Sequence, residues 1–253
     1  SSAAPLKGVR VLTLALNLPG PAAVMRLQAM GAQCTKLEPL ATKGMSTADP
    51  MGIYKPAAYE AMHKGLKVMQ ADLKSEHGQQ ALHKQLARTD VLITSFRPSA
   101  LKKLGLVWKE FHQRYPALCV ISIVGAPGAR AEEPGHDLTY LADNGLVNGL
   151  ELPPSLYADM GGSLLTTEAV LLFGLALDRA DQPRMRMTQR IDRNTRREIE
   201  ISAAVFPDQM AVFTAHRPEA AAGIDWHERG DRHRGILFEN CISGIRKRQM
   251  AAP

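Results

Sequence analysis

VRVLTLALNLPGPAAVMRLQAMGAQCTKLEP, residues 9–39, contains two short apolar runs separated by a helical segment. Residues 9–14 have the pattern of a buried strand, and residues 33–37 repeat that pattern. Residues 22–30 have helical spacing and end at Gly31. Strand, helix and strand in this order predict two parallel strands joined by a right-handed crossover. The stretch therefore predicts an α/β fold with a parallel sheet.

The same alternation continues along the chain. Residues 90–94 and 118–124 are apolar runs typical of a third and a fourth strand. Ser75 is a good N-cap for a helix between the second and third strands, and a buried helix is predicted over residues 163–177. Residues 40–60 are rich in Pro, Gly, Thr and Met and are predicted to be a loop. Open sheets of this kind bind ligands at the carboxyl ends of their strands.

Charge and cysteine content limit the classes of partner. The chain has 253 residues and a net charge of +6, and its positive charge is concentrated between Arg179 and Arg248. Aromatic residues do not alternate with these charges, so we expect a small polyanionic ligand rather than nucleic acid. The three cysteines are widely spaced and form no CxxC pair, which predicts neither a metal site nor a disulfide framework.

The sequence also bears on where in the cell the protein is located. We find no apolar run long enough to cross a bilayer, and the N-terminus lacks the basic-then-apolar order of a signal peptide. Cys34 and Cys119 lie in strand-like apolar runs and are expected to be buried thiols, as in a reducing compartment. These observations predict a cytoplasmic protein that does not contact a membrane.

Acid–base side chains occur in two turn-rich segments. His136 and Asp137 follow Gly135, and Asp159 precedes two further glycines. A His and an Asp that face one carbon atom form a proton-transfer pair, because each can donate or accept a proton. The alternative is that Gly-His-Asp marks only a turn with a local side-chain hydrogen bond. The motif alone leaves both interpretations open.

These segments and several others have the order and spacing found in one known family. Over residues 6–177 the chain resembles the class III CoA-transferases, and its motifs are most similar to those of the α-methylacyl-CoA racemase branch. The matching segments are LKGVRVL (6–12), GP (20–21), GA (31–32), KLEP (36–39), DLK (72–74), DVLI (90–93), FRP (96–98), LGL (104–106), GHD (135–137) with Tyr140, and ADMGG (158–162).

The resemblance implies a Rossmann-like CoA-binding domain with flanking helices, in a homodimer of two interlocked chains. The large domain with its catalytic loops would comprise residues 1–177. Residues 178–213 would connect it, through a family-like strand, to an atypical basic tail at residues 214–253. Beyond residue 205 the chain no longer resembles the family, so its C-terminal part is expected to be incomplete or atypical.

The resemblance also assigns roles to the acid–base residues. Asp159 matches the essential aspartate, which carries the acyl group in the transferases and is a proton-transfer partner in the racemase. His136 matches the other partner, so the implied activity is α-proton transfer on a 2-methylacyl-CoA. Backbone N–H groups near Gly161 would then stabilise the enolate oxygen. The alternatives are CoA transfer between carboxylic acids, with Asp159 as the nucleophile, and a non-catalytic CoA-binding remnant.

Contacts to CoA are likewise implied by position in the family. No cofactor is expected beyond CoA as part of the acyl-CoA substrate. Arg97 is the strongest candidate for a charge-assisted phosphate contact, because Pro98 fixes the turn that follows a buried strand. The full set of implied CoA contacts is Leu18, Pro19, His63, Lys64, Lys67, Ser95, Phe96, Arg97, Lys103, Gly125, Asp137 and Tyr140.

Overall fold

A computed structural model describes residues 4–181 apart from 108–109, 111–112, 116, 127 and 148, together with residues 198–202 and 214–215. In this part of the chain, seven strands form one sheet in the order β3-β2-β1-β4-β5-β6-β7. All neighbouring strands are parallel except β6 and β7. The strands are β1 Arg10–Thr13, β2 Gln33–Glu38, β3 Lys67–Gln70, β4 Val91–Thr94, β5 Cys119–Val124, β6 Glu198–Ser202 and β7 Thr214–Ala215.

This strand order confirms the predicted Rossmann-like fold, because β3-β2-β1-β4-β5-β6 is the order of a doubly wound sheet. The direction of winding reverses between β1 and β4. Buried parallel strands are apolar on both faces, which explains why short apolar runs identified β1, β4 and β5 from sequence. β3 was not predicted, since it is a partly exposed edge strand with no apolar run.

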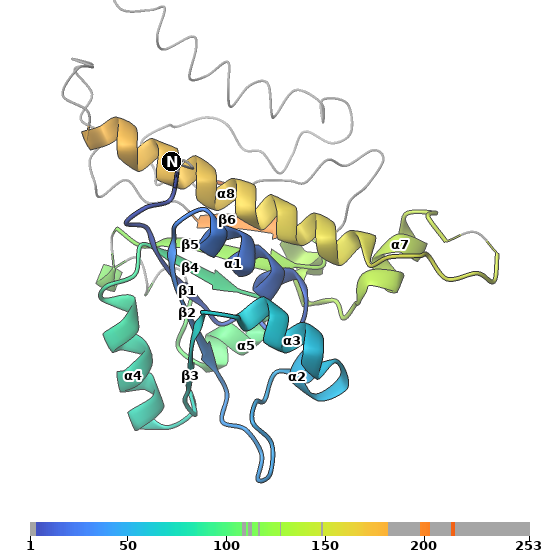
Figure 1. Ribbon diagram of the computed structural model, residues 1–253, viewed down its shortest axis with the longest axis horizontal. Coiled ribbons are helices and arrows are strands. Elements are labelled where there is room, and N and C mark those ends of the chain that lie inside the picture. Colours follow the sequence, from blue (N-terminus) through green and yellow to red (C-terminus); the bar gives the residue numbers. More distant parts are fainter. Residues whose placement is uncertain are drawn as a thin grey trace, which may run out of the picture.

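Helices cover both faces of the sheet (Figure 1). One face packs against α1 (Pro19–Ala29) and α8 (Tyr157–Asp181), and the other against α4 (Glu76–Leu86) and α5 (Pro98–Lys103). Successive strand residues point to opposite faces. Val11 therefore joins the α1 and α8 core, whereas Leu12 joins the α4 core.

Several predicted elements differ from the structure, including α1, which begins at Pro19 rather than at residue 22. Residues 40–60 contain two short helices, α2 (Pro50–Tyr54) and α3 (Pro56–His63), where a loop was predicted. Each begins at a proline, which is favourable at a first turn but reads as a helix breaker in sequence. Helix α8 begins at Tyr157 rather than at residue 163, so it contains Asp159 and the glycines after it.

Other features follow the sequence closely. Ser75 caps α4, and its Oγ accepts a hydrogen bond from the Gly78 N–H at 3.0 Å. Cys119 is buried as predicted, but Cys34 is only half-buried. The strand predicted near residue 198 is β6. Most of the charge-dense segment and basic tail, with Cys241, lies outside the described residues. Within the described part, no helix is long and apolar enough to cross a membrane.

Candidate functional site

An open cleft with a volume of about 220 Å³ lies at the carboxyl edge of the sheet. Its walls come from the loops after β1, β4 and β5, from the 3₁₀ helix η1 (Gly128–Glu132) and the loop after it, and from α7 (Asp137–Asp143) and α8. β1 and β4 are the strands between which the winding direction reverses, the usual place for a ligand in such a sheet. The fold therefore places the cleft where an α/β protein binds small molecules.

The cleft brings together eight of the fourteen predicted site residues. They are Pro19, Ser95, Phe96, Arg97, Gly125, His136, Tyr140 and Asp159. Asp137 is buried outside the lining and accepts a hydrogen bond from the Asp159 N–H. The sequence did not identify the remaining lining residues, which are Leu16, Asn17, Ile123, Val124, Ala131, Glu133 and Gly135. Most of these residues lie at strand ends or in loops. The predicted ends of β1 and β5 were the sequence features that could have identified those beside these two strands.

Asp159 is half-buried in the first turn of α8. Its backbone N–H donates a hydrogen bond of 2.9 Å to Oδ1 of Asp137, which is buried at the start of α7. Burial and the nearby Asp137 carboxylate raise the pKa of Asp159 to about 6, although His136 opposes this shift. Both protonation states of Asp159 are therefore accessible near neutral pH, as acid–base catalysis requires.

His136 is exposed and lies on the wall of the same cleft as Asp159. It directly precedes α7, and its backbone N–H donates to Oγ1 of Thr139 at 3.4 Å. The turn interaction considered from sequence is thus present, because His136 and Thr139 form a capping box at the start of α7, and His136 also lines the cleft. The two interpretations of Gly-His-Asp are compatible.

The ring of Tyr140 fits between two glycines. A Cβ on Gly125 would lie 2.4 Å from the Tyr140 hydroxyl oxygen, and one on Gly135 would lie 2.5 Å from its Cε1. Any larger residue would therefore displace the ring. Burial and Asp159 raise the pKa of Tyr140, whereas Arg97 lowers it. The net upward shift keeps the phenol protonated, so it can donate a hydrogen bond into the cleft.

The loop after β1 is held by several hydrogen bonds. The backbone N–H of Asn17 donates to Oδ1 of Asp49 at 3.0 Å, and the Tyr54 hydroxyl donates to Oδ1 of Asn17 at 3.3 Å. The N–H of Leu16 donates to Oγ of Ser95 at 3.3 Å. Asn17 has a φ of 63°, a conformation that asparagine tolerates better than most residues. This tolerance was the sequence signal for a special role at this position.

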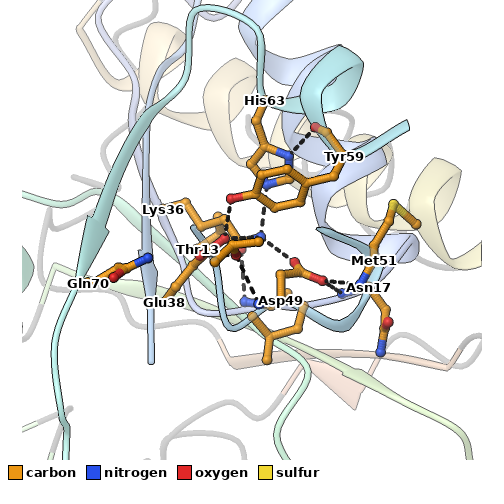
Figure 2. A network of polar contacts seen from close by, with 12 residues as sticks. Thr13, Asn17, Lys36, Glu38, Asp49, Met51, Tyr59, His63 and Gln70 are labelled. Atoms are coloured by element: carbon orange, nitrogen blue, oxygen red, sulfur yellow. Dashed lines mark hydrogen bonds and ion pairs between the residues drawn. The ribbon is translucent and has the colours of Figure 1, made fainter. Parts of the chain in front are cut away.

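His63, predicted to contact CoA, instead belongs to a buried ionic cluster formed by Lys36, Glu38, Asp49 and His63 (Figure 2). Nδ1 of His63 donates to the carbonyl oxygen of Tyr59 at 2.6 Å, because a carbonyl can only accept. Nε2 then accepts from Nζ of Lys36 at 2.8 Å. His63 is therefore absent from the cleft lining.

The ionic cluster has ligand atoms close enough to hold a metal ion. One ligand atom each from Glu38, Asp49 and His63 lie within 4.8 Å of one another. The ammonium group of Lys36 bonds to all three side chains, however, and so occupies the centre of the group. The cluster is held together by Lys36.

The remaining predicted CoA contacts lie outside the cleft lining. Lys64 follows α3, Lys67 begins β3 and Lys103 ends α5, and all three are exposed. Leu18 packs against the small apolar cluster of Ala22, Met51 and Met62. The contacts predicted for these positions stay predictions.

The expected enolate-stabilising groups near Gly161 are not available. Gly161 and Gly162 lie inside α8, and the helix hydrogen bonds have already begun with the Met160 N–H, which donates to the carbonyl of Leu156. Backbone N–H groups beyond the first turn of a helix are bonded within it. The prediction was wrong because the helix begins before the glycines. Tyr140 is one of the hydrogen-bond donors that line the cleft.

A family model matches most of this part of the chain. The model of CoA-transferase family III matches residues 6–184, which include β1 to β5, the cleft and α8. The chain belongs to CoA-transferase family III. As a member of family III, it is 31% identical over 166 residues to cinnamoyl-CoA:phenyllactate CoA-transferase of Clostridium sporogenes, covering 61% of this chain and 40% of that protein.

Other family III members show the same partial overlap. The chain is 31% identical over 177 residues to the alpha-methylacyl-CoA racemase of Mus musculus, covering 66% of this chain and 44% of the racemase. A crystal structure of a CAIB/BAIF family protein from Brucella suis superposes with a TM-score of 0.61 at 25% identity, covering 69% of this chain and 50% of that one. The chain spans less than half the length of the two sequence relatives named here.

Proposed function

We propose that this family III protein acts on acyl-CoA thioesters and moves a proton at the α-carbon of a 2-methylacyl-CoA. The observation that carries the proposal is the placement of His136 and Asp159 on one cleft, with the pKa of Asp159 raised to about 6. An α-methylacyl-CoA racemase among the relatives supports the same chemistry.

The proton transfer follows from these two side chains. A thioester carbonyl makes the neighbouring α-proton acidic, because charge delocalises onto its oxygen. One of the two groups removes the proton as a base, and the other returns a proton to the opposite face of the carbon. The protonated phenol of Tyr140 would donate a hydrogen bond to the enolate oxygen.

The CoA part of the substrate would lie along the loop after β4. Arg97 lines the cleft immediately before α5, where its guanidinium can form charge-assisted hydrogen bonds with phosphate. Ser95 and Phe96 line the same wall. CoA enters as part of the substrate, and the proposal requires no other cofactor.

CoA transfer between carboxylic acids is the second candidate. It is favoured by the names of several relatives, such as (R)-2-hydroxy-4-methylpentanoate CoA-transferase of Clostridioides difficile. Asp159 would then attack the thioester carbonyl as a carboxylate, forming a mixed anhydride and releasing CoA as a thiolate. A pKa of about 6 leaves Asp159 mostly ionised at neutral pH, which permits this role as well.

The decisive experiment follows hydrogen exchange at the α-carbon of a 2-methylacyl-CoA in deuterium oxide by NMR. We expect exchange with the wild type and its loss in His136→Gln and Asp159→Asn. Hydroxylamine trapping of an acyl group on Asp159, without α-exchange, would favour transfer. CoA binding measured by calorimetry, with neither reaction, would instead support a non-catalytic CoA-binding protein.

A further inference from the structure

The ionic cluster is fully enclosed by protein. Lys36 and Asp49 are 0% exposed, Glu38 is 1% exposed and His63 is 8% exposed. Nζ of Lys36 lies 2.9 Å from Oε1 of Glu38 and also bonds to Asp49 and His63. Burying ionised groups is costly unless each is paired and hydrogen-bonded. Because Lys36 is inaccessible, its charge cannot contact a ligand directly.

Asp49 connects this cluster to the cleft. Its Oδ2 bonds to Lys36, and its Oδ1 accepts two backbone N–H groups, from Asn17 and from Met51, each at 3.0 Å (Figure 2). The Lys36 ammonium fixes the carboxylate, and the carboxylate in turn fixes the loop after β1. The link therefore runs from β2, through the segment before α2, to the wall of the cleft.

The segment held in this way has an unusual backbone conformation. Within the described residues, Asn17 alone among non-glycine residues has a positive φ, at 63°. Asparagine tolerates this conformation better than most residues, and hydrogen bonds with Asp49 and Tyr54 hold it in place here. Asn17 and its neighbours Leu16 and Pro19 line the cleft. Loss of the Asp49 contact would allow this wall to relax away from its observed shape.

We propose that Lys36 and Asp49 are positioning residues that hold the Asn17 turn, and with it one wall of the acyl-CoA cleft. The identity of the ligand in this inference rests on the proposed function. The positioning itself is a property of the free protein and can be tested without ligand.

The test compares Asp49→Asn with Asp90→Asn. Asp49 accepts from the Asn17 N–H through Oδ1 and from Lys36 through Oδ2. Asparagine has only one acceptor oxygen, so Asp49→Asn loses one of these two contacts. Asp90 is a matched control at the other end of β1, where its carboxylate accepts the Arg10 backbone N–H at 2.8 Å and binds the Arg10 side chain. Tyr54→Phe is a milder second variant, since Tyr54 is exposed and its hydroxyl bonds to Asn17.

Amide hydrogen exchange of a peptide spanning Asn17 and CoA affinity by calorimetry are measured on all four proteins. We expect Asp49→Asn to accelerate exchange at Asn17 and to weaken CoA binding, each by about tenfold or more, and Tyr54→Phe to weaken binding about threefold. Asp90→Asn should leave both unchanged within about twofold.

Unchanged exchange at Asn17 in Asp49→Asn would overturn the positioning role. Equal losses in Asp49→Asn and Asp90→Asn would also overturn it, because they would indicate general destabilisation. If Asp49→Asn does not fold, an unaltered CoA affinity in Tyr54→Phe counts against the proposal. If the wild type binds no CoA, the proposed function fails, and the exchange comparison still decides whether Asp49 holds the turn.

Discussion

At the scale of single residues, Asp159 shows how the fold tunes a side chain for chemistry. A carboxylate on an exposed helix would ionise near its ordinary pKa. Burial of Asp159 in the cleft wall and the nearby Asp137 carboxylate raise its pKa to about 6. Keeping a charge that the surroundings disfavour has a cost in stability at neutral pH.

We therefore predict that Asp159→Asn abolishes activity but stabilises the fold. The folded state binds the Asp159 proton more tightly than the unfolded chain, so the wild type loses stability as pH rises from about 4 to about 6. Asparagine has no such loss. Urea unfolding should show a gain of about 1–2 kcal/mol near pH 7.5, discounted for partial exposure, that disappears near pH 4. An equal gain at both pH values would contradict this explanation.

Gly125 gives a second prediction at this scale. Gly125→Ala places a methyl group against the Tyr140 ring and should destabilise the fold by about 1–3 kcal/mol. Tyr140→Ala removes the clash, so the double variant should be more stable than the sum of the two single effects. Thermal unfolding of the wild type, the two single variants and the double variant gives the double-mutant cycle. Additive effects would mean that the two residues do not meet.

At the scale of elements, helix boundaries determine which groups reach the cleft. α8 begins at Tyr157, which places Asp159 in its first turn and removes the glycines behind it from use as hydrogen-bond donors. α5 begins at Pro98, directly after Arg97, so the guanidinium leaves the chain at the cleft. The sequence located α8 but predicted its start at residue 163, and this error changed the predicted chemistry.

The N-cap of α4, which was predicted from sequence, can be tested for its contribution to the stability of the fold. Ser75→Ala removes the hydrogen bond to the Gly78 N–H and should destabilise the fold by about 1 kcal/mol. Ser75→Asp keeps an acceptor at the same position and should retain most of the stability. Chemical denaturation of the two variants measures this difference, and similar losses in both would show that the cap hydrogen bond is unimportant.

At the scale of the whole molecule, the ionic cluster connects three parts of the chain. Lys36 and Glu38 come from β2, Asp49 directly precedes α2, and His63 ends α3. Burial and the neighbouring Lys36 lower the pKa of His63, so the fold holds the neutral imidazole. As pH falls below about 6.5, His63 is protonated in the unfolded chain before it is protonated in the folded protein, so the fold loses stability. Glu38 acts at lower pH, because hydrogen bonds from Thr47, Lys36 and Tyr59 outweigh its burial and lower its pKa.

We predict that His63→Gln reduces the loss of stability between about pH 7 and pH 5 by about 1 kcal/mol. The glutamine oxygen can still accept from Lys36 but does not titrate. Asp159 contributes in the opposite direction in both proteins, so the difference between their urea unfolding curves isolates His63. Parallel pH profiles for the two proteins would rule out His63 as the titrating group.

The quaternary state stays a prediction of the family resemblance. A homodimer should sediment at about twice the monomer mass of 27.6 kDa at micromolar concentration. Sedimentation velocity over a range of concentrations checks this, and a single species of monomer mass would contradict it.

The sequence by itself determined the parallel sheet and the family. β1, β4 and β5 are short apolar runs because both faces of a central parallel strand are buried, and this local pattern is readable without neighbours. His136, Asp159 and Arg97 were identified through motifs that match the family.

Tertiary structure alone decided the shape and electrostatics of the site. Asp49 bonds to the Asn17 turn, Gly125 contacts the Tyr140 ring, and Lys36 bonds to Asp49 and His63. Each of these contacts joins residues more than ten positions apart, so the sequence did not predict them. The pKa of Asp159 is set by burial and by neighbouring charges, and both exist only once the chain has folded.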